Sequence, residues 1–383
     1  MAAALQARER WRRWHARLCW PLGLLLALLG LSGSLLVYYP ALDEQLNPAL
    51  AWTPRDGAVT AWQPVWQALV AQAPERGTAW RIELPPSPGG MVTARLYRPA
   101  ERAGAFFAPW LVTLHPRTLQ PLARRFWGDT AMTWLYDLHY TLLAGATGRT
   151  VVGLLGLWGL AALLTGLVLW WPRSPAQWRT AWWAKAGAAR PRRSWDQHRL
   201  TGLYGAGLLA VLMATGTALA WPDTVALLLR PWSHPAPAPA AAVPACDPLH
   251  GGAGLDVALA VARLRFPQGR PRWIDTPATG QDLIRVRLQQ PGEPSARFPA
   301  TYVWVDACSG ALRGVQDPAQ EGAGDALRRW LHPLHNGEAF GQAGRLLACL
   351  GGLLPAVLIW TGWRRRRDRQ RGAAHRPGAC RGS

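Results

Sequence analysis

The stretch HRLTGLYGAGLLAVLMATGTALAWP, residues 198–222, decides the fold, because a histidine and an arginine are followed there by a long uncharged run. The stretch HARLCWPLGLLLALLGLSGSLLVYYP, residues 15–40, has the same plan. In both, a glycine follows the histidine by 18 positions and a proline ends the apolar run. A helix needs about 20 apolar residues to cross a bilayer. Each stretch predicts a transmembrane helix, and the shared plan predicts an internal duplication.

A second pair of segments repeats in the same way. His139 and His335 are each followed after nine positions by Gly-Arg and after 26 positions by Thr-Gly. A tryptophan lies five positions before each of these histidines. The coincident intervals predict two copies of one unit, a helix, an external domain and a second helix, related by a pseudo-two-fold axis along the membrane normal. This symmetry places His15 opposite His198, and His139 opposite His335.

The uncharged runs and the basic segments between them predict the topology. The expected membrane helices are residues 18–39, 150–171, 200–221 and 346–363. Residues 1–17, 172–199 and 364–383 carry 17 of the 20 net positive charges, so the positive-inside rule places them, with both termini, in the cytoplasm. Residues 40–149 and 222–345 are then periplasmic parts of a multi-pass protein of the bacterial inner membrane. Val-Tyr-Tyr-Pro after the first run offers no small-residue cleavage site, which favours an uncleaved anchor.

The charge of +20 by itself suggests a nucleic-acid partner. Its distribution argues against that function, because the basic residues crowd beside apolar runs and form no basic groove with interleaved aromatic residues. The 24 tryptophans, many of them at the ends of those runs, are typical of membrane interfaces. Membrane lipid is therefore the expected partner, and nucleic acid is not.

Each external segment is expected to form a small α+β module with one amphipathic helix and three strands. The first module has its expected helix at 60–72 and its strands at 80–84, 92–98 and 110–115. The second has its helix at 255–266 and its strands at 272–275, 283–288 and 302–306. Cys246 and Cys308 both lie in the second segment and are candidates for a disulfide in an oxidising compartment. Whether their Cα atoms come within about 7 Å stays open at this point.

The chain resembles the PepSY-associated transmembrane proteins, often called iron-regulated membrane proteins. Val-Asp-Ala-Cys-Ser-Gly-Ala-Leu at 305–312 is similar to the ending of a PepSY domain, whereas the first module has His115 where that pattern has aspartate. The matching helical motifs are Trp-His-Ala-Arg-Leu at 14–18, Leu-His-Tyr-Thr-Leu-Leu at 138–143, His-Arg-Leu-Thr-Gly-Leu at 198–203 and Leu-His-Pro-Leu-His-Asn-Gly at 331–337. The resemblance covers roughly residues 10–367 and implies a di-haem inner-membrane reductase of ferric siderophores.

Four histidines are the candidate cofactor ligands: His15 and His198 towards the cytoplasm, His139 and His335 towards the outside. A b-type haem between helices takes two neutral imidazoles, one on each side of the iron. The sequence has no CxxCH motif for covalent attachment, so the four histidines predict two haem b groups. The alternative is that these are structural histidines at the headgroup level.

The outer pair raises a question of depth. His139 and His335 precede their apolar runs by ten or eleven residues, about 15 Å of helix, so the chain near residues 145–148 must fold back to bring His139 into the membrane. His332 lies one turn before His335 on the same helix face and is the alternative outer ligand. The histidines without a repeat partner are expected at the surface; they are His115, His234, His250 and His375.

The expected function is a transmembrane di-haem electron carrier, an oxidoreductase that reduces a ferric siderophore or another ferric chelate in the periplasm. Arg117, Arg124 and Arg125 are candidates to attract an anionic chelate. No flavin or NAD fingerprint is present, so a separate donor is expected: a quinol, a flavoprotein or a cytosolic reductase. A haem-free protein with a sensory or peptidase-regulatory role is the alternative. A transporter is disfavoured because no charged residue lies inside a predicted span.

Overall fold

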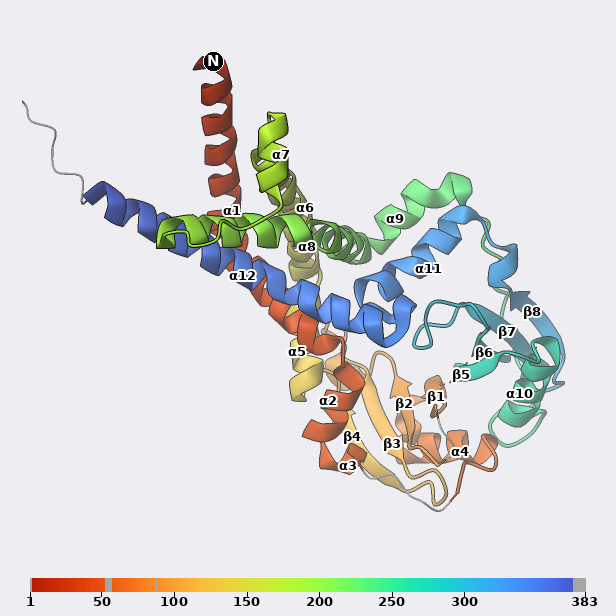
Figure 1. The fold of residues 1–383 in the computed structure, drawn as a ribbon. Helices are drawn as coiled ribbons and strands as arrows, with labels where there is room; N and C mark the ends of the chain where they lie inside the picture. Colours follow the sequence, from red (N-terminus) through yellow and green to blue (C-terminus); the bar gives the residue numbers. More distant parts are fainter. Residues whose placement is uncertain (1, 52–56, 87–88, 375–383) are drawn as a thin grey trace, which may run out of the picture. The chain divides into compact units, whose positions relative to one another are not determined.

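The structure, a computed structural model, describes residues 2–51, 57–86 and 89–374 (Figure 1). These residues form two compact units. The helical unit comprises residues 2–37, 138–222 and 334–374, and the sheet unit comprises the described parts of 38–137 and 223–333. Both halves of the sequence repeat contribute to both units.

The helical unit is built on long helices that are apolar enough to cross a membrane. They are α1 (Ala2–Leu36), α6 (Gly145–Trp170), α8 (Arg190–Ala220) and α12 (Gly341–Ala374). Within the described residues these four are the candidate spans, which confirms the predicted number. Leucines such as Leu24 and Leu164 are 74% and 63% exposed, as expected of side chains that face lipid.

The four long helices form a closed bundle: α1 and α8 each pack against both α6 and α12. Small residues at the contacts let the helix backbones approach closely. A Cβ atom added to Gly30 of α1 would lie 2.2 Å from the carbonyl oxygen of Gly352 of α12. The glycines of the apolar runs therefore serve close packing of the helices in this bundle.

Two shorter helices, α5 (Ala131–Thr141) and α11 (Ala323–His335), end just before α6 and α12, and the chain turns back sharply after each of them. After α5 the turn uses left-handed backbone at Leu142, Leu143 and Gly145, with φ values of 49°, 59° and 56°. After α11 it uses Gly337 and Gly341, with φ values of 77° and 61°. The fold-back that the depth of His139 requires is therefore present, and both repeats have it.

The Gly-Arg signature of the repeat marks these turns. A Cβ on Gly148 would lie 1.6 Å from the carbonyl oxygen of Thr141, and a Cβ on Gly344 would lie 2.2 Å from that of Gly337. Only glycine leaves room for the returning helix to touch the end of the helix before it. Both halves of the repeat therefore have a glycine at the position where the turn leaves no room for a side chain.

The sheet unit is one antiparallel sheet of eight strands in the order β4-β3-β2-β1-β5-β6-β7-β8 (Figure 1). The strands of the first half are β1 (Trp80–Glu83), β2 (Val92–Leu96), β3 (Trp110–Leu114) and β4 (Pro121–Phe126). Those of the second half are β5 (Arg270–Asp275), β6 (Leu283–Gln289), β7 (Thr301–Asp306) and β8 (Leu312–Gln316). Each module thus has a fourth strand, β4 or β8, that the sequence analysis missed.

The two predicted modules are joined edge to edge. Strand β1 pairs with β5 so that Ile82 lies opposite Ile274. An isolated module would leave this strand edge unpaired, and the pairing satisfies its backbone groups. The two predicted modules thus form one sheet with one core.

The predicted helices α4 (Gln63–Gln72) and α10 (Gly254–Arg265) share that core. Alternate strand residues such as Ile82, Val286 and Val303 point into it and are fully buried. Asp256 of α10 accepts hydrogen bonds from the backbone N–H groups of Trp62 and Gln63, at 2.8 and 3.0 Å, and so caps α4. The two halves therefore stabilise each other through the sheet, the core and a helix cap.

On the opposite face of the sheet, Asp275 of β5 forms ion pairs with Arg81, Arg285 and Arg287. Burial alone would raise the pKa of this carboxyl group, but the three guanidinium groups outweigh it and hold the pKa below its ordinary value. The carboxylate is therefore ionised at neutral pH and links β1, β5 and β6 across the junction of the two halves.

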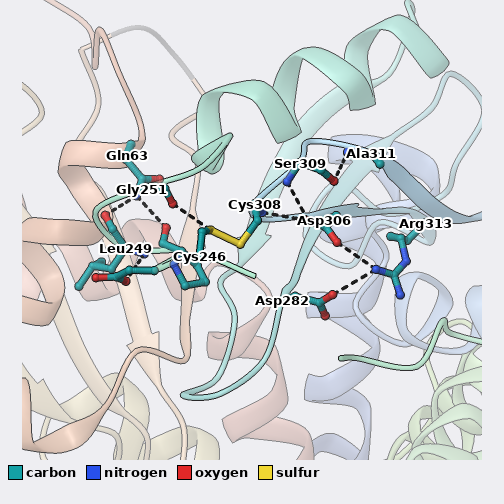
Figure 2. Close-up of a disulfide and its surroundings, with 12 residues drawn as sticks. Gln63, Cys246, Leu249, Gly251, Asp282, Asp306, Cys308, Ser309, Ala311 and Arg313 are labelled. Atoms are coloured by element: carbon teal, nitrogen blue, oxygen red, sulfur yellow. Dashed lines mark hydrogen bonds and ion pairs between the residues drawn. A yellow bond between two sulfur atoms is a disulfide. The ribbon is translucent and has the colours of Figure 1, made fainter. Parts of the chain in front are cut away.

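A disulfide joins Cys246 to Cys308, with Cα atoms 5.7 Å apart (Figure 2). The distance meets the requirement left open by the sequence, and the predicted disulfide is confirmed. Beside it, Asp306 accepts hydrogen bonds from the N–H groups of Cys308 and Ser309, at 3.0 and 2.8 Å. These hydrogen bonds lower the pKa of Asp306, and the bond from Ser309 has the largest effect. The disulfide thus fastens the segment before α10 to the turn between β7 and β8.

The remaining α-helices are short. They are α2 (Tyr39–Leu46), α3 (Pro48–Ala51), α7 (Pro175–Ala181) and α9 (Pro222–Leu229).

Candidate ligand pairs in the helical unit

The four repeat-related histidines meet in two pairs inside the helical unit. The rings of His15 and His198 have their centres 6.2 Å apart, at an interplanar angle of 72°. The rings of His139 and His335 have their centres 6.1 Å apart, at 43°. We call the first the basic-end pair, because it lies where α1 and α12 carry their arginines, and the second the fold-back pair. The rings are paired as the sequence repeat predicts.

Each histidine is held by a neighbouring helix through its Nδ1 atom. In the basic-end pair, His15 Nδ1 lies 3.1 Å from the Ala162 carbonyl oxygen and 2.9 Å from Thr165 Oγ1. His198 Nδ1 lies 3.1 Å from both the Leu358 carbonyl oxygen and Thr361 Oγ1. Helix α6 thus orients the ring from α1, and α12 orients the ring from α8.

The fold-back pair has the same contacts from the other two helix segments. His139 Nδ1 lies 3.0 Å from the Leu29 carbonyl oxygen and 3.1 Å from Ser32 Oγ, both on α1. His335 Nδ1 lies 3.1 Å from the Leu212 carbonyl oxygen and 3.0 Å from Thr215 Oγ1 on α8. One carbonyl and one hydroxyl three positions later therefore hold every ring.

These contacts determine which ring nitrogen carries the proton. The hydroxyl groups donate to carbonyls of their own helices, as Ser32 does to Leu28 at 2.8 Å and Thr361 to Val357 at 2.8 Å. The carbonyl and the hydroxyl at each Nδ1 are then both acceptors, so Nδ1–H is the donor and Nε2 carries the lone pair. At His15 the Cys19 Sγ atom lies 3.7 Å from that Nε2. An imidazole fixed in this tautomer by a backbone carbonyl is the usual arrangement of a metal-binding histidine.

The glycine after each hydroxyl lies against the ring it holds. A Cβ on Gly33 or Gly216 would lie 2.8 or 2.9 Å from Cε1 of the fold-back histidines. The corresponding distances at Gly166 and Gly362 in the basic-end pair are 3.2 and 3.6 Å. The Ser/Thr-Gly dipeptides of the repeat are thus the ring-holding elements, and they are tighter at the fold-back pair.

The two pairs lie at different levels of the bundle. Ser32 follows His15 by 17 positions on α1, and Thr215 follows His198 by 17 positions on α8. At about 1.5 Å per residue, the levels are roughly 25 Å apart along the helices. That distance is most of the ~30 Å hydrocarbon thickness of a bilayer.

The residues fit a porphyrin-bound iron at each level. A metal ion between two imidazole nitrogens, with bonds of roughly 2 Å to each, separates the ring centres by about 6 Å. Both observed separations agree with that value. In the part of the chain that the structure describes, no group of three or more His, Cys, Asp and Glu residues is arranged for a metal. Each pair offers two nitrogens, the number that an iron in a porphyrin leaves open.

Comparison with known families now bears on both units. The profile of the PepSY-associated TM region matches residues 12–366. The chain belongs to this family. No curated protein matches it. In this PepSY-associated protein the match includes all four paired histidines and the whole sheet unit.

The other histidines of this PepSY-associated protein lie elsewhere. His332, the alternative outer ligand, belongs to the sheet unit and packs its ring on Phe298, with centres 4.4 Å apart. His115 accepts hydrogen bonds from the backbone N–H groups of Arg117 and Thr118, and exposed His250 pairs with Asp247. His234 also lies in the sheet unit, and His375 is outside the described residues.

Two of the arginines expected to attract a chelate are engaged within the sheet unit. Arg125 pairs with buried Asp43, and Arg124 donates a hydrogen bond to Gln72. From the sequence, the Thr-Gly dipeptides were used only as evidence of the repeat, and no function was assigned to the hydroxyl groups that hold the rings. Their position before a glycine, at equal intervals from the histidines, was the signal that could have assigned it.

Proposed function

We propose that this PepSY-associated protein binds two b-type haems, one between His15 and His198 and one between His139 and His335, and carries electrons across the bacterial inner membrane. The observation that supports this most is the fourfold Nδ1 anchoring, with ring centres 6.2 and 6.1 Å apart in the two pairs. Histidines with a purely structural role would not require the same tautomer in all four rings, or the same distance between ring centres in both pairs. When bound, each haem would supply a one-electron carrier.

The protein's own residues account for position and access. Four hydroxyl groups hold the rings at Nδ1 and leave Nε2 as the atom available to the iron; they belong to Ser32, Thr165, Thr215 and Thr361. The rings lie half-buried among the apolar helices of the bundle. Two levels about 25 Å apart divide the membrane crossing into shorter steps.

The direction we propose is from the cytoplasm to the periplasm. The basic segments next to the bundle follow the positive-inside rule and put both termini in the cytoplasm. Both segments of the sheet unit then lie in the periplasm. The Cys246–Cys308 disulfide is consistent with this oxidising compartment. The basic-end pair faces the donor, which is a quinol, a flavoprotein or a cytosolic reductase.

We further propose a ferric siderophore or another ferric chelate as the periplasmic acceptor. The sheet unit is the folded region on that side and is the place for a substrate to bind. Transfer of one electron converts Fe(III) to Fe(II), which binds the hard oxygen ligands of a siderophore far more weakly and is released. This step requires an electron from the separate donor and produces no other covalent change.

The first test is optical. Purified protein is expected to show a b-type α-band on reduction and about two haems per chain in a pyridine haemochrome assay. Well-folded protein without haem would favour the alternative, a haem-free protein with a sensory or peptidase-regulatory sheet unit.

The second test addresses the acceptor. Protein reduced with dithionite and freed of excess reductant is mixed in a stopped-flow instrument with ferric siderophore. Re-oxidation of the haem band together with ferrozine-trapped Fe(II) is expected. Re-oxidation no faster than in anaerobic buffer, across several siderophores, would exclude ferric reduction while leaving electron transfer standing.

A further inference from the structure

Four residues occupy equivalent places in the helical unit, each four positions after a ring-holding hydroxyl. Three of them are leucines: Leu36, Leu169 and Leu219. The fourth, after Thr361, is Arg365. Residues four apart share a helix face, so Arg365 lies on the face of α12 that holds His198, one turn closer to the basic end. Arg365 is thus a charged residue at a position where the other three equivalent residues are leucines.

The surroundings of Arg365 leave that charge without an anion. Thr361, one turn before Arg365, lies 3.1 Å from His198 Nδ1, and the ring centre of His15 lies 6.2 Å from that of His198, so Arg365 is on the side of α12 that faces the basic-end pair. The charged groups that act on it most are all cationic: Arg369, Arg12 and Arg8. Among the described residues, no ion pair joins Arg365 to an acidic side chain.

The three acids at this end are bound elsewhere. Buried Asp196 pairs with Arg192 and Arg199. Glu9 pairs with Arg12 and Arg13. Buried Asp368 accepts a hydrogen bond from Ser194 at 2.9 Å and lies 3.6 Å from Arg190. A half-buried guanidinium among other cations is costly unless an anion joins it. An anionic ligand group beside the two imidazoles would supply that partner.

We propose that Arg365 binds a propionate carboxylate of the haem held by His15 and His198. The inference rests on the proposed function and adds to it the orientation of that haem, with its carboxylate edge towards the basic end. A guanidinium binds a carboxylate through two parallel N–H···O bonds, and burial strengthens the pair. At the fold-back pair the equivalent places hold Leu36 and Leu219, so the two haem sites differ in charge although their ligands match.

The experiment compares haem with its dimethyl ester, which has the same iron and ring but no free carboxylate. Full-length apoprotein carrying His139→Ala, which leaves only the basic-end pair complete, is titrated with each compound. The same titrations are made on that background with Arg365→Leu, which installs the residue of position 169, and with Arg365→Lys. Arg366→Leu is the matched control, because Arg366 lies at the neighbouring position and stacks on Trp20 at 5.0 Å. His335→Ala replaces His139→Ala if the latter fails to fold.

Protein with Arg365 is expected to bind haem at least about tenfold more tightly than the ester, as a charge-assisted pair contributes. Arg365→Leu should abolish this preference, Arg365→Lys should keep part of it, and Arg366→Leu should keep all of it. The midpoint potential of the remaining haem should fall in Arg365→Leu, because a positive charge favours the reduced state. Equal preference for haem over ester with and without Arg365 overturns the proposal. Absence of haem from the unsubstituted protein overturns the proposed function instead, and this inference with it.

Discussion

The basic-end pair and the fold-back pair hold their rings by the same contacts but position their histidines by different means. His15 and His198 lie within long helices, so bundle packing alone brings them together. His139 and His335 lie at or near the ends of short helices, and left-handed turns must return the chain to the bundle. The comparison shows that one ligand geometry can be reached by a continuous helix or by a reversed one, and that the second route depends on glycines which the first does without.

The largest effect is expected from the ligands themselves, and it tests whether the pairs are independent. Either His15→Ala or His198→Ala should remove one haem of two, and either His139→Ala or His335→Ala should remove the other, because an iron loses half of its axial ligands. Haemochrome counts and reduced spectra of the four variants check this. The pairing is wrong if His15→Ala combined with His198→Ala removes both haems, or if His332→Ala removes one.

The next largest effect should fall on the fold-back pair alone. In Gly344→Ala, the new Cβ would lie 2.2 Å from the Gly337 carbonyl oxygen, and backbone atoms cannot move aside cheaply. We expect most of the fold-back haem to be lost and the basic-end haem to be kept. Haem content of the purified variant measures it, with Gly207→Ala on α8 as the control, since its Cβ would meet no atom within 4 Å. Equal loss of both haems would mean that the turn supports the whole bundle.

A smaller difference should separate the ring-contacting glycines. Gly216→Ala would bring a methyl group to 2.9 Å from His335 Cε1, whereas Gly362→Ala would leave 3.6 Å to His198 Cε1. The first distance forces the ring to move by a few tenths of an ångström, and the second is ordinary contact. We expect a shifted spectrum and several-fold faster haem loss in Gly216→Ala, followed by transfer to apomyoglobin, and little change in Gly362→Ala. Comparable changes in both would show that the two pairs are equally tight.

The smallest effect should be the same in both pairs. Thr215→Val and Thr361→Val each remove one hydroxyl acceptor but leave the carbonyl that also binds Nδ1. A neutral hydrogen bond contributes about 1 kcal/mol, so haem affinity should fall roughly fivefold in each variant. Competitive haem-binding titrations would measure it. A large loss in only one variant would show that the shared contacts are not energetically equivalent.

Much of the helical unit follows from local chemistry. Uncharged runs of membrane length predicted the spans, and the intervals from histidine to glycine predicted which rings lie opposite each other. The depth of the fold-back pair did not follow, because three residues between α5 and α6 reverse the chain, and the backbone angles of Leu142 and Leu143 have no signature in their residue types. The choice of His335 over His332 likewise depends on where α11 ends.

The sheet unit divides differently. Alternating apolar residues predicted β1 to β3 and β5 to β7. Strand β4 has Arg124 and Arg125 in its middle, and its sequence resembles a polar loop. These two side chains are held by Gln72 and Asp43, which are distant in the sequence. The junction of β1 with β5 joins residues almost 200 positions apart, since Ile82 pairs with Ile274. Nothing local distinguishes a strand edge that stays free from one that pairs.

The repeat intervals and the uncharged runs were enough to establish a duplicated four-helix membrane protein with two histidine pairs, because helix periodicity and bilayer thickness act on neighbouring residues. Tertiary packing alone decided which carbonyl and hydroxyl hold each ring, that Cys246 meets Cys308, and that Arg365 lies beside an imidazole pair without a counter-charge. Those features depend on contacts between segments distant in the sequence. Their energies are set by distances of a few ångströms, which no local pattern encodes.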